Sequence, residues 1–138
     1  MHRVKVIGRT ELPTATMASL VSFPFFAYRK ASQLCKKYSY EFINTHFAVP
    51  TGPLGVWISK RFKMKNILSL HGGDIYDPTK KSSPHKTWYF RSVVHWVLRH
   101  SDVIVAQSSN TKENTEQFYQ PNKPIEIIPL PYRSFSIS

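Results

Sequence analysis

The sequence predicts an α/β fold in which a parallel β-sheet carries helices on both faces. Short apolar segments typical of buried strands alternate with longer segments that have helical periodicity. Several of the strand segments end in glycine, histidine or small polar residues, as strands do at the ligand-binding edge of a parallel sheet. The 138 residues are 41% hydrophobic, which is enough for one domain with a buried core.

Nine elements are predicted along the chain. Strands are predicted at Arg3–Ile7, Tyr40–Asn44, Asn66–Leu70, Asp102–Ala106 and Ile125–Ile128. Helices are predicted at Phe25–Tyr38, Thr51–Phe62, His85–His100 and Asn110–Tyr119. The second helix has Pro53 in its first turn, where a missing N–H costs nothing, and the fourth opens with Asn110 and Glu113 at capping-box spacing. Strands and helices that alternate at this spacing are typical of βαβ units.

The net charge of the sequence indicates which classes of molecule the protein would bind. A net charge of +11 predicts attraction to anions, namely nucleic acid, an anionic membrane surface or phosphate-bearing substrates. Basic residues gather near predicted helix ends, which fits either solvated faces or contact with anionic lipids. No sequence-specific nucleic-acid motif is present, so no specific nucleic acid is expected. The single cysteine and the lack of a leader or spanning segment predict a cytoplasmic protein, with the cytoplasmic membrane face as a candidate location.

Polar and glycine-bearing segments follow three of the predicted strands. Residues 45–47 and 50–53 follow the strand at 40–44, residues 71–74 follow the next, and residues 107–110 follow the third. In a parallel sheet all of these segments lie along one edge. The helix that begins near Thr51 would direct free N–H groups at the same crevice, beside Gly52.

The sequence HGGD, residues 71–74, carries the most specific chemistry. Gly72 and Gly73 let the backbone turn sharply and approach a ligand closely. His71 would project over that ligand, and Asp74 could accept hydrogen bonds from hydroxyl groups. A plain turn capped by Asp74 explains the same residues. His46 alone is more typical of a structural histidine, but two histidines at corresponding strand ends are stronger evidence together.

Three segments in order resemble the N-terminal half of a GT-B glycosyltransferase of family 4. They are FINTHFAVPTGPLGVWISKRFKMKNILSLHGGDIY, SDVIVAQSSNTKENTEQFY and IEIIPLPY, and the resemblance covers about residues 40 to 132. It implies a Rossmann-like domain of a retaining enzyme that uses a nucleotide-diphosphate sugar as donor. It also implies that no metal or other cofactor is required, and that the acceptor is a glycan or a lipid-linked molecule.

The same resemblance implies roles for individual residues. His71 takes the place of the histidine that lies in the catalytic cleft. Residues 46–52, with His46, Thr51 and Gly52, match a loop that lines the acceptor side. Gly72, Gly73 and Asp74 belong to the turn beside the substrate, and Ser108 matches a strand-end serine that faces the cleft.

Two parts of the family pattern have no counterpart in the sequence. One is the first strand with its glycine-rich loop, and the other is the second domain, which makes most donor contacts. The sequence therefore predicts that residues 1–138 are a single partial N-terminal domain, with the donor-binding domain absent and little activity alone. The alternative is a non-catalytic basic module that binds sugar or phosphate, or an inactive remnant.

Overall fold

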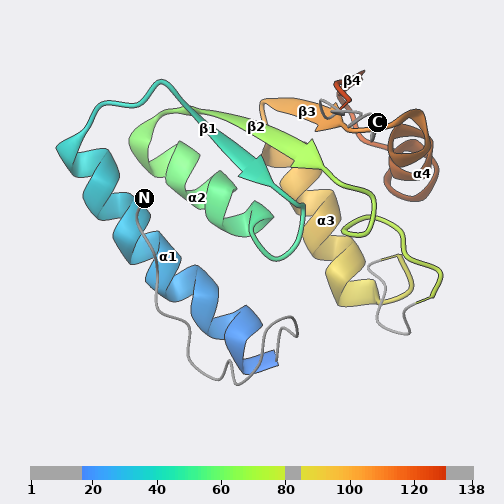
Figure 1. Ribbon diagram of the computed structural model, residues 1–138, viewed down its shortest axis with the longest axis horizontal. Helices are drawn as coiled ribbons and strands as arrows, with labels where there is room; N and C mark the ends of the chain where they lie inside the picture. Colours follow the sequence, from blue (N-terminus) through green and yellow to red (C-terminus); the bar gives the residue numbers. More distant parts are fainter. Residues whose placement is uncertain (1–16, 80–84, 130–138) are drawn as a thin grey trace, which may run out of the picture.

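The computed structural model describes residues 17–79 and 85–129. These residues form four helices and four strands that alternate along the chain (Figure 1). The helices are α1 (Met17–Lys37), α2 (Gly52–Phe62), α3 (Trp88–His100) and α4 (Ser109–Tyr119). The strands are β1 (Phe42–His46), β2 (Lys65–Leu70), β3 (Val103–Ala106) and β4 (Ile125–Ile127).

The four strands form one parallel sheet in the order β1-β2-β3-β4. In the register of the sheet, His46 lies beside Ser69, and Leu70 lies beside Ala106. The predicted α/β class is therefore confirmed. The register also brings the carboxyl ends of β1, β2 and β3 to one edge, as the prediction of a common ligand-binding edge requires.

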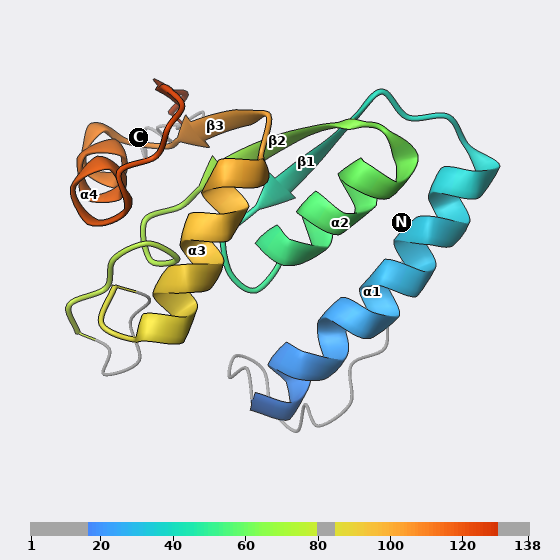
Figure 2. The ribbon, with the colours of Figure 1, turned by 180° about the vertical axis from the view of Figure 1, so that it is seen from behind.

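The helices that connect the strands share one layer. Val56 of α2, Val97 of α3 and Tyr119 of α4 pack in a single core cluster with Leu68 and Ile104 of the sheet. Figures 1 and 2 show α2 and α3 side by side against the strands, with α1 beyond α2. Each strand is added next to the one before it, so right-handed crossovers place successive helices on the same face. Within the described residues the helix layer is therefore one-sided, whereas the sequence predicts helices on both faces.

Element boundaries differ from the prediction at three points. α1 begins at Met17 rather than Phe25, with Pro24 inside the helix. β1 lies two residues later than predicted, so His46 is the last residue of the strand. The predicted strand at 3–7 lies outside the described residues. Of the helices in residues 17–79 and 85–129, none combines the length and apolarity needed to cross a membrane.

The predicted capping box of α4 is wrong. Ser108 is the N-cap residue, and its Oγ accepts a hydrogen bond of 3.1 Å from the backbone N–H of Thr111. The N–H of Thr111 is in the first turn of the helix and has no partner within the helix, so the serine just before the helix supplies one. Asn110 and Glu113 are therefore not needed as caps. Ser108 therefore has a helix-capping role that the sequence pattern does not reveal.

A chain of buried polar groups aligns β1, β2 and the end of α3. Thr45 Oγ1 donates to Asn66 Oδ1 at 2.8 Å, and Asn66 Nδ2 donates to Ser101 Oγ at 3.3 Å. Asn66 is fully buried, and Ser101 Oγ donates in turn to the carbonyl of Val97. A buried amide destabilises the fold unless it is hydrogen-bonded. This series of hydrogen bonds therefore fixes the alignment of β1 with β2 and with the end of α3.

Two glycines of α2 allow close packing. A Cβ on Gly52 would lie 2.7 Å from Val97 Cγ1, and a Cβ on Gly55 would overlap the side chain of Thr45. Both glycines are buried. α2 therefore approaches α3 and β1 more closely than a residue with a side chain would permit, and Gly52 has a packing role.

We expect Gly55→Ala to lower the free energy of unfolding by about 1–3 kcal/mol, because the added methyl group must displace Thr45 from a filled core. Urea denaturation measures the change. Gly73→Ala is the matched control, since a Cβ there meets no atom within 4 Å. Equal stabilities of the two variants would show that α2 can move away from β1 at no cost.

Candidate glycosyltransferase site

Three side chains meet where adjacent strands end. His46 ends β1, His71 follows β2 and Gln107 follows β3. The Nδ1 of His46 lies 2.9 Å from the Nε2 of His71, and the Nε2 of Gln107 lies 2.8 Å from the Nδ1 of His71. The structure thus brings together the two histidines selected from the sequence. It adds Gln107, whose sequence signal is only its position directly after a strand.

Phe47 is the second residue that the sequence pattern misses. Its ring stacks on the ring of His71, with the centroids 4.2 Å apart and the planes 27° from parallel. Its backbone has a φ of 71°, which is uncommon for a bulky residue, while its N–H donates to the carbonyl of Ser69 at 3.0 Å. The strand-end cluster is defined as His46, Phe47, His71, Asp74 and Gln107.

Asp74 joins the two loops of the strand-end cluster. Its Oδ2 accepts a hydrogen bond of 2.6 Å from the backbone N–H of Ala48, and its Oδ1 accepts one of 3.0 Å from the N–H of His71. The side chain is buried. Burial raises the pKa of Asp74 above its usual value, and hydrogen bonds from the backbone N–H groups of Ala48, His71 and Asp74 itself oppose that shift. Both carboxylate oxygens thus accept backbone N–H groups, and Asp74 bridges the two loops.

The two glycines of the turn have different tasks. Gly72 has a φ of 95°, in the left-handed region that glycine adopts readily, and its carbonyl accepts hydrogen bonds from Ile75 and Tyr76. A Cβ there would also lie 3.3 Å from Thr111 Oγ1. Gly73 is exposed, with open space where a side chain would be. Gly72 is therefore required by the turn, and Gly73 leaves room for a ligand above it.

The environment of His71 favours the neutral imidazole. Burial lowers the pKa of His71 below its usual value, and the neighbouring His46 acts in the same direction, whereas Asp74 raises it. A neutral imidazole offers one N–H donor and one acceptor nitrogen. Such a ring can hold a hydroxyl group in place, but it supplies no fixed positive charge.

The other predicted ligands have structural partners. Thr51 Oγ1 donates to the carbonyls of His46 and Phe47 and closes the loop between β1 and α2. Ser108 caps α4, and Gly52 is packed against Val97. The structure therefore places Thr51 beside the strand-end cluster, but it places the side chain of Ser108 against its own helix.

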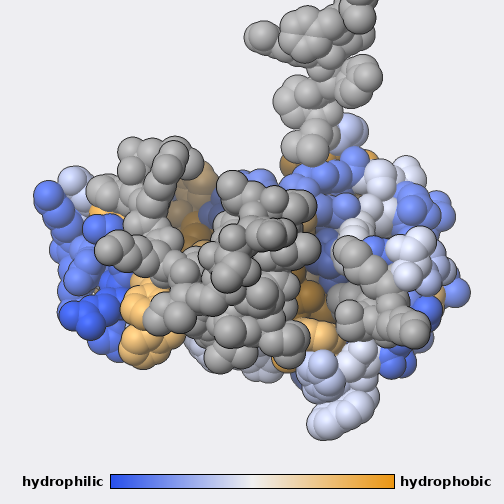
Figure 3. Space-filling model, turned by 60° about the horizontal axis from the view of Figure 1, so that its bottom comes forward, coloured by the Kyte–Doolittle hydropathy of each residue, from blue (hydrophilic) through white to orange (hydrophobic). Residues whose placement is uncertain are grey.

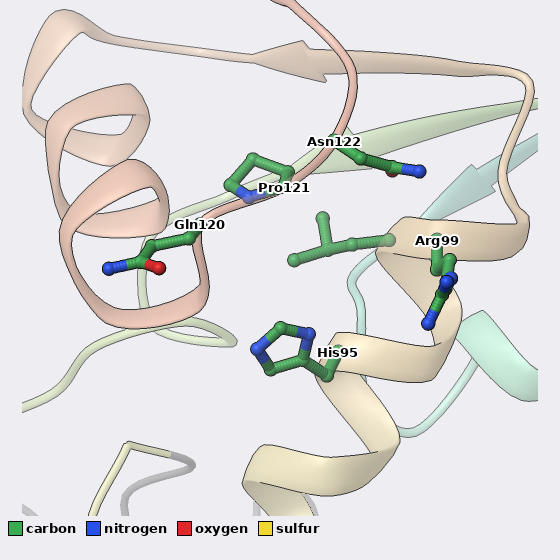
Figure 4. A pocket seen from close by; sticks show the side chains of 6 residues that line it. His95, Arg99, Gln120, Pro121 and Asn122 are labelled. Atoms are coloured by element: carbon green, nitrogen blue, oxygen red, sulfur yellow. The ribbon is translucent and has the colours of Figure 1, made fainter.

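A groove of about 320 Å³ runs beside the outer edge of β1. Its lining combines apolar residues of α1, β1 and α2 with the strand-end residues His46, Phe47 and Thr51. A second cavity, of about 140 Å³, lies between α3 and the α4–β4 loop, where His95 and Arg99 face Gln120, Pro121 and Asn122 (Figure 4). That cavity shares no residue with the strand-end cluster. The groove beside β1 is therefore the one that adjoins the predicted site.

A metal site needs several His, Cys, Asp or Glu side chains in one place. Across residues 17–79 and 85–129, no three or more His, Cys, Asp or Glu side chains come together in a way that could hold a metal ion. The strand-end cluster contributes two imidazoles and one carboxylate whose oxygens accept backbone N–H groups. The chemistry available to this cluster is therefore hydrogen bonding through imidazole, amide and backbone groups.

Comparison with known protein families identifies the class. The model of a family described as Glycosyltransferase Family 4 matches residues 2–132 of the chain. This match covers nearly the whole sequence and includes both histidines, so the chain belongs to glycosyltransferase family 4. The family supports a function of the glycosyltransferase type, with sugar donor and acceptor as its substrates. No curated protein matches the chain.

We expect Asp74→Ala to lower the free energy of unfolding, by about 1–3 kcal/mol for each backbone N–H that loses its partner. Urea denaturation at pH 7 gives the value. Glu116→Ala removes an exposed carboxylate that pairs with Lys112 at 3.9 Å, and it should change stability by less than about 0.5 kcal/mol. A loss for Asp74→Ala as small as that of the control would contradict the bridging role.

The lowered pKa of His71 predicts a pH dependence of stability. A group whose pKa is lower in the folded than in the unfolded chain contributes stability above its ordinary pKa and loses it as the pH falls through the folded value. The free energy of unfolding of the wild type should therefore exceed that of His71→Gln by less at pH 5 than at pH 8. Urea denaturation at both pH values measures it, and a difference that is constant with pH would contradict the lowered pKa.

Proposed function

We propose that this chain forms the acceptor-binding part of a retaining glycosyltransferase that uses a nucleotide-diphosphate sugar. The observation that carries the proposal is the pair of hydrogen-bonded imidazoles, His46 and His71, at adjacent strand ends of a family 4 chain. The acceptor is a glycan or a lipid-linked molecule with free hydroxyl groups. The donor sugar is assigned to a second domain that completes the cleft.

The local chemistry suits a sugar hydroxyl. Neutral imidazoles can donate or accept a hydrogen bond, and the open surface above Gly73 leaves room for a ring of this size. In a retaining transfer the acceptor hydroxyl attacks from the face that the phosphate leaves. The strand-end cluster would orient that hydroxyl, and oriented hydrogen-bond donors would stabilise charge that develops in the transition state. Asp74 acts by holding the two loops in position.

A different class of function fits the same geometry. A basic, non-catalytic module could bind sugar or phosphate at these strand ends without transferring anything. The two classes differ in one product, because only a transferase releases a nucleoside diphosphate from a nucleotide sugar in the presence of an acceptor.

In a protein that also carries the donor-binding domain, we expect His71→Ala to lower the rate of transfer about 100-fold, because one hydrogen-bonding group of the strand-end cluster is lost. The measurement is chromatography of the nucleoside diphosphate released from UDP-, GDP- and ADP-sugars with a panel of hexose acceptors. His95→Ala, on the far cavity of α3, is the matched control and should leave the rate unchanged. Transfer that is unaffected by His71→Ala would refute the role of this residue.

If no donor and acceptor pair gives any product, the backbone amide resonances of residues 46–51 and 71–74 decide between the remaining options. Perturbation of these resonances by sugars alone would favour the binding module. If no sugar shifts these resonances, both the transferase and the binding module are rejected.

A basic and aromatic patch on α2 favours an acceptor presented at an anionic membrane surface. Lys60 and Arg61 are exposed near the end of α2, and Trp57 has 51% of its surface exposed. Lys60 Nζ lies 5.8 Å from the ring of Trp96. Hydrophilic residues, blue in Figure 3, cover much of the visible surface, and hydrophobic residues form smaller patches between them. Basic residues beside an exposed indole are typical of contact with lipid headgroups.

We expect the double variant Lys60→Ala, Arg61→Ala to weaken binding to vesicles of phosphatidylglycerol. At roughly 1 kcal/mol for each basic residue, the loss is about 30-fold together. Vesicle co-sedimentation measures it, and added salt should weaken binding of the wild type. Lys36→Ala, Lys37→Ala at the end of α1 removes the same charge elsewhere. An equal loss in both variants would indicate a general charge effect instead of a patch on α2.

A further inference from the structure

The cavity between α3 and the α4–β4 loop gathers side chains that can donate hydrogen bonds. His95 and Arg99 lie one helical turn apart on α3 and form one wall, and Gln120 and Asn122 of the loop form the other (Figure 4). The volume of about 140 Å³ is roughly five times the ~30 Å³ that a water molecule occupies in the liquid. The cavity therefore has room for a phosphate group, but it is too small for a nucleotide.

The polar side chains of this cavity are not used elsewhere in the fold. Among residues 17–79 and 85–129, the guanidinium of Arg99 has no hydrogen bond or ion pair, and the ring of His95 only approaches Tyr119 edge-on. The side-chain amides of Gln120 and Asn122 have no partner in the same part of the chain. The lining includes no carboxylate from the described residues. Because a guanidinium has five donors and no acceptor, the cavity holds an excess of donors and a fixed positive charge.

The position of Arg99 in the last turn of α3 has a simpler explanation, because a basic residue there compensates the negative end of the helix dipole. Another residue already has that task. Lys123 Nζ donates to the carbonyl of Arg99 at 3.2 Å and to the carbonyl of Ser101. The end of α3 is therefore bound by an ammonium group, and the guanidinium of Arg99 is left for a ligand in the cavity. Lys123 also adds a second positive charge at this end of the helix.

A wider hollow of about 430 Å³ adjoins the same wall of α3. It is lined by His95, Trp96, Arg99 and His100. The ring of His100 lies against the ring of Trp96, with the centroids 4.9 Å apart. The smaller cavity therefore opens beside an aromatic surface, on which the organic part of a phosphate ester can lie.

The geometry points to a phosphate-binding site in this cavity, for a phosphate monoester that is either a free small molecule or a lipid headgroup. The planar guanidinium of Arg99 pairs with two phosphate oxygens at once. The imidazole of His95 and the amides of Gln120 and Asn122 donate to the remaining oxygens. The cavity shares no residue with the strand-end cluster, so the site is independent of the proposed function, and transfer to soluble acceptors does not require it.

The first test is a titration of the ¹⁵N-labelled full chain with inorganic phosphate at pH 7 and constant ionic strength. We expect saturable shifts of the Arg99 Nε–H resonance and of the backbone amides of residues 95, 120 and 122. Arg99→Gln should weaken binding at least about tenfold, because charge-assisted hydrogen bonds are lost. Arg29→Gln removes the same charge from an exposed position of α1 and should leave the affinity unchanged. Equal weakening in the two variants, or the lack of any saturable shift, would overturn the proposal.

A second variant leaves the α3 wall of the cavity intact. In Asn122→Asp a carboxylate lies in the same cavity as Arg99 and pairs with it, so phosphate should be excluded. Gln33→Glu adds the same charge at an exposed position of α1 and is the matched control. Phosphate binding to Asn122→Asp that is as tight as binding to Gln33→Glu would contradict the assignment of the anion to this cavity.

Glycerol 3-phosphate and vesicles that contain phosphatidic acid carry the same monoester and separate the two sources of the phosphate. If glycerol 3-phosphate binds and Arg99→Gln co-sediments with vesicles as Arg29→Gln does, the ligand is a free phosphate ester. If Arg99→Gln co-sediments more weakly than Arg29→Gln, the ligand is a lipid headgroup. If neither inorganic phosphate, glycerol 3-phosphate nor phosphatidic acid perturbs the cavity, the site is rejected, and the function proposed for the strand-end cluster is unaffected.

Discussion

The carboxylate of Asp74 is the interaction on which the strand-end cluster depends. It links two loops that are 26 residues apart in the sequence, through the N–H groups of Ala48 and His71. Once these two backbone positions are fixed, Phe47 lies over the ring of His71 and the ring lies within reach of both neighbours. The turn at Gly72 completes the arrangement by bringing Asp74 back beneath the strand ends.

On the helix-covered face of the sheet, β1 and β2 are held by neutral polar side chains. The chain of hydrogen bonds from Thr45 through Asn66 to Ser101 joins β1 and β2 to the end of α3. β1 and β2 are therefore connected by buried polar groups as well as by their backbone ladder. A one-residue slip of β1 would leave both sets of groups unpaired in the interior, where each costs about 1–3 kcal/mol. This rigidity is what allows three separate strands to align one row of side chains.

The sequence was sufficient for the order and type of the eight described elements, because apolar periodicity reports burial directly. It was also sufficient to place His46 and His71 at one edge. It could not reveal the partners of individual side chains. Gly52 fills a contact with Val97 of another helix, which lies outside the local pattern, whereas the cap by Ser108 is local but was assigned to Asn110, two residues later. The sequence placed the segments that contain Phe47 and Gln107 at the same edge, but it did not predict their contacts with His71, because stacking and pairing across strands leave no local signal.

The sequential strand order also determines how the molecule can assemble. Each strand pairs with the one that precedes it, so every new βα unit adds to an edge that already exists, as in a solenoid that grows from one end. The contact between the two imidazoles needs only β1 and β2, whereas the contact of His71 with the amide of Gln107 needs β3 as well. The strand-end cluster is consequently complete only when three strands are paired in the correct order, so an intact cluster is a marker of a correctly assembled sheet.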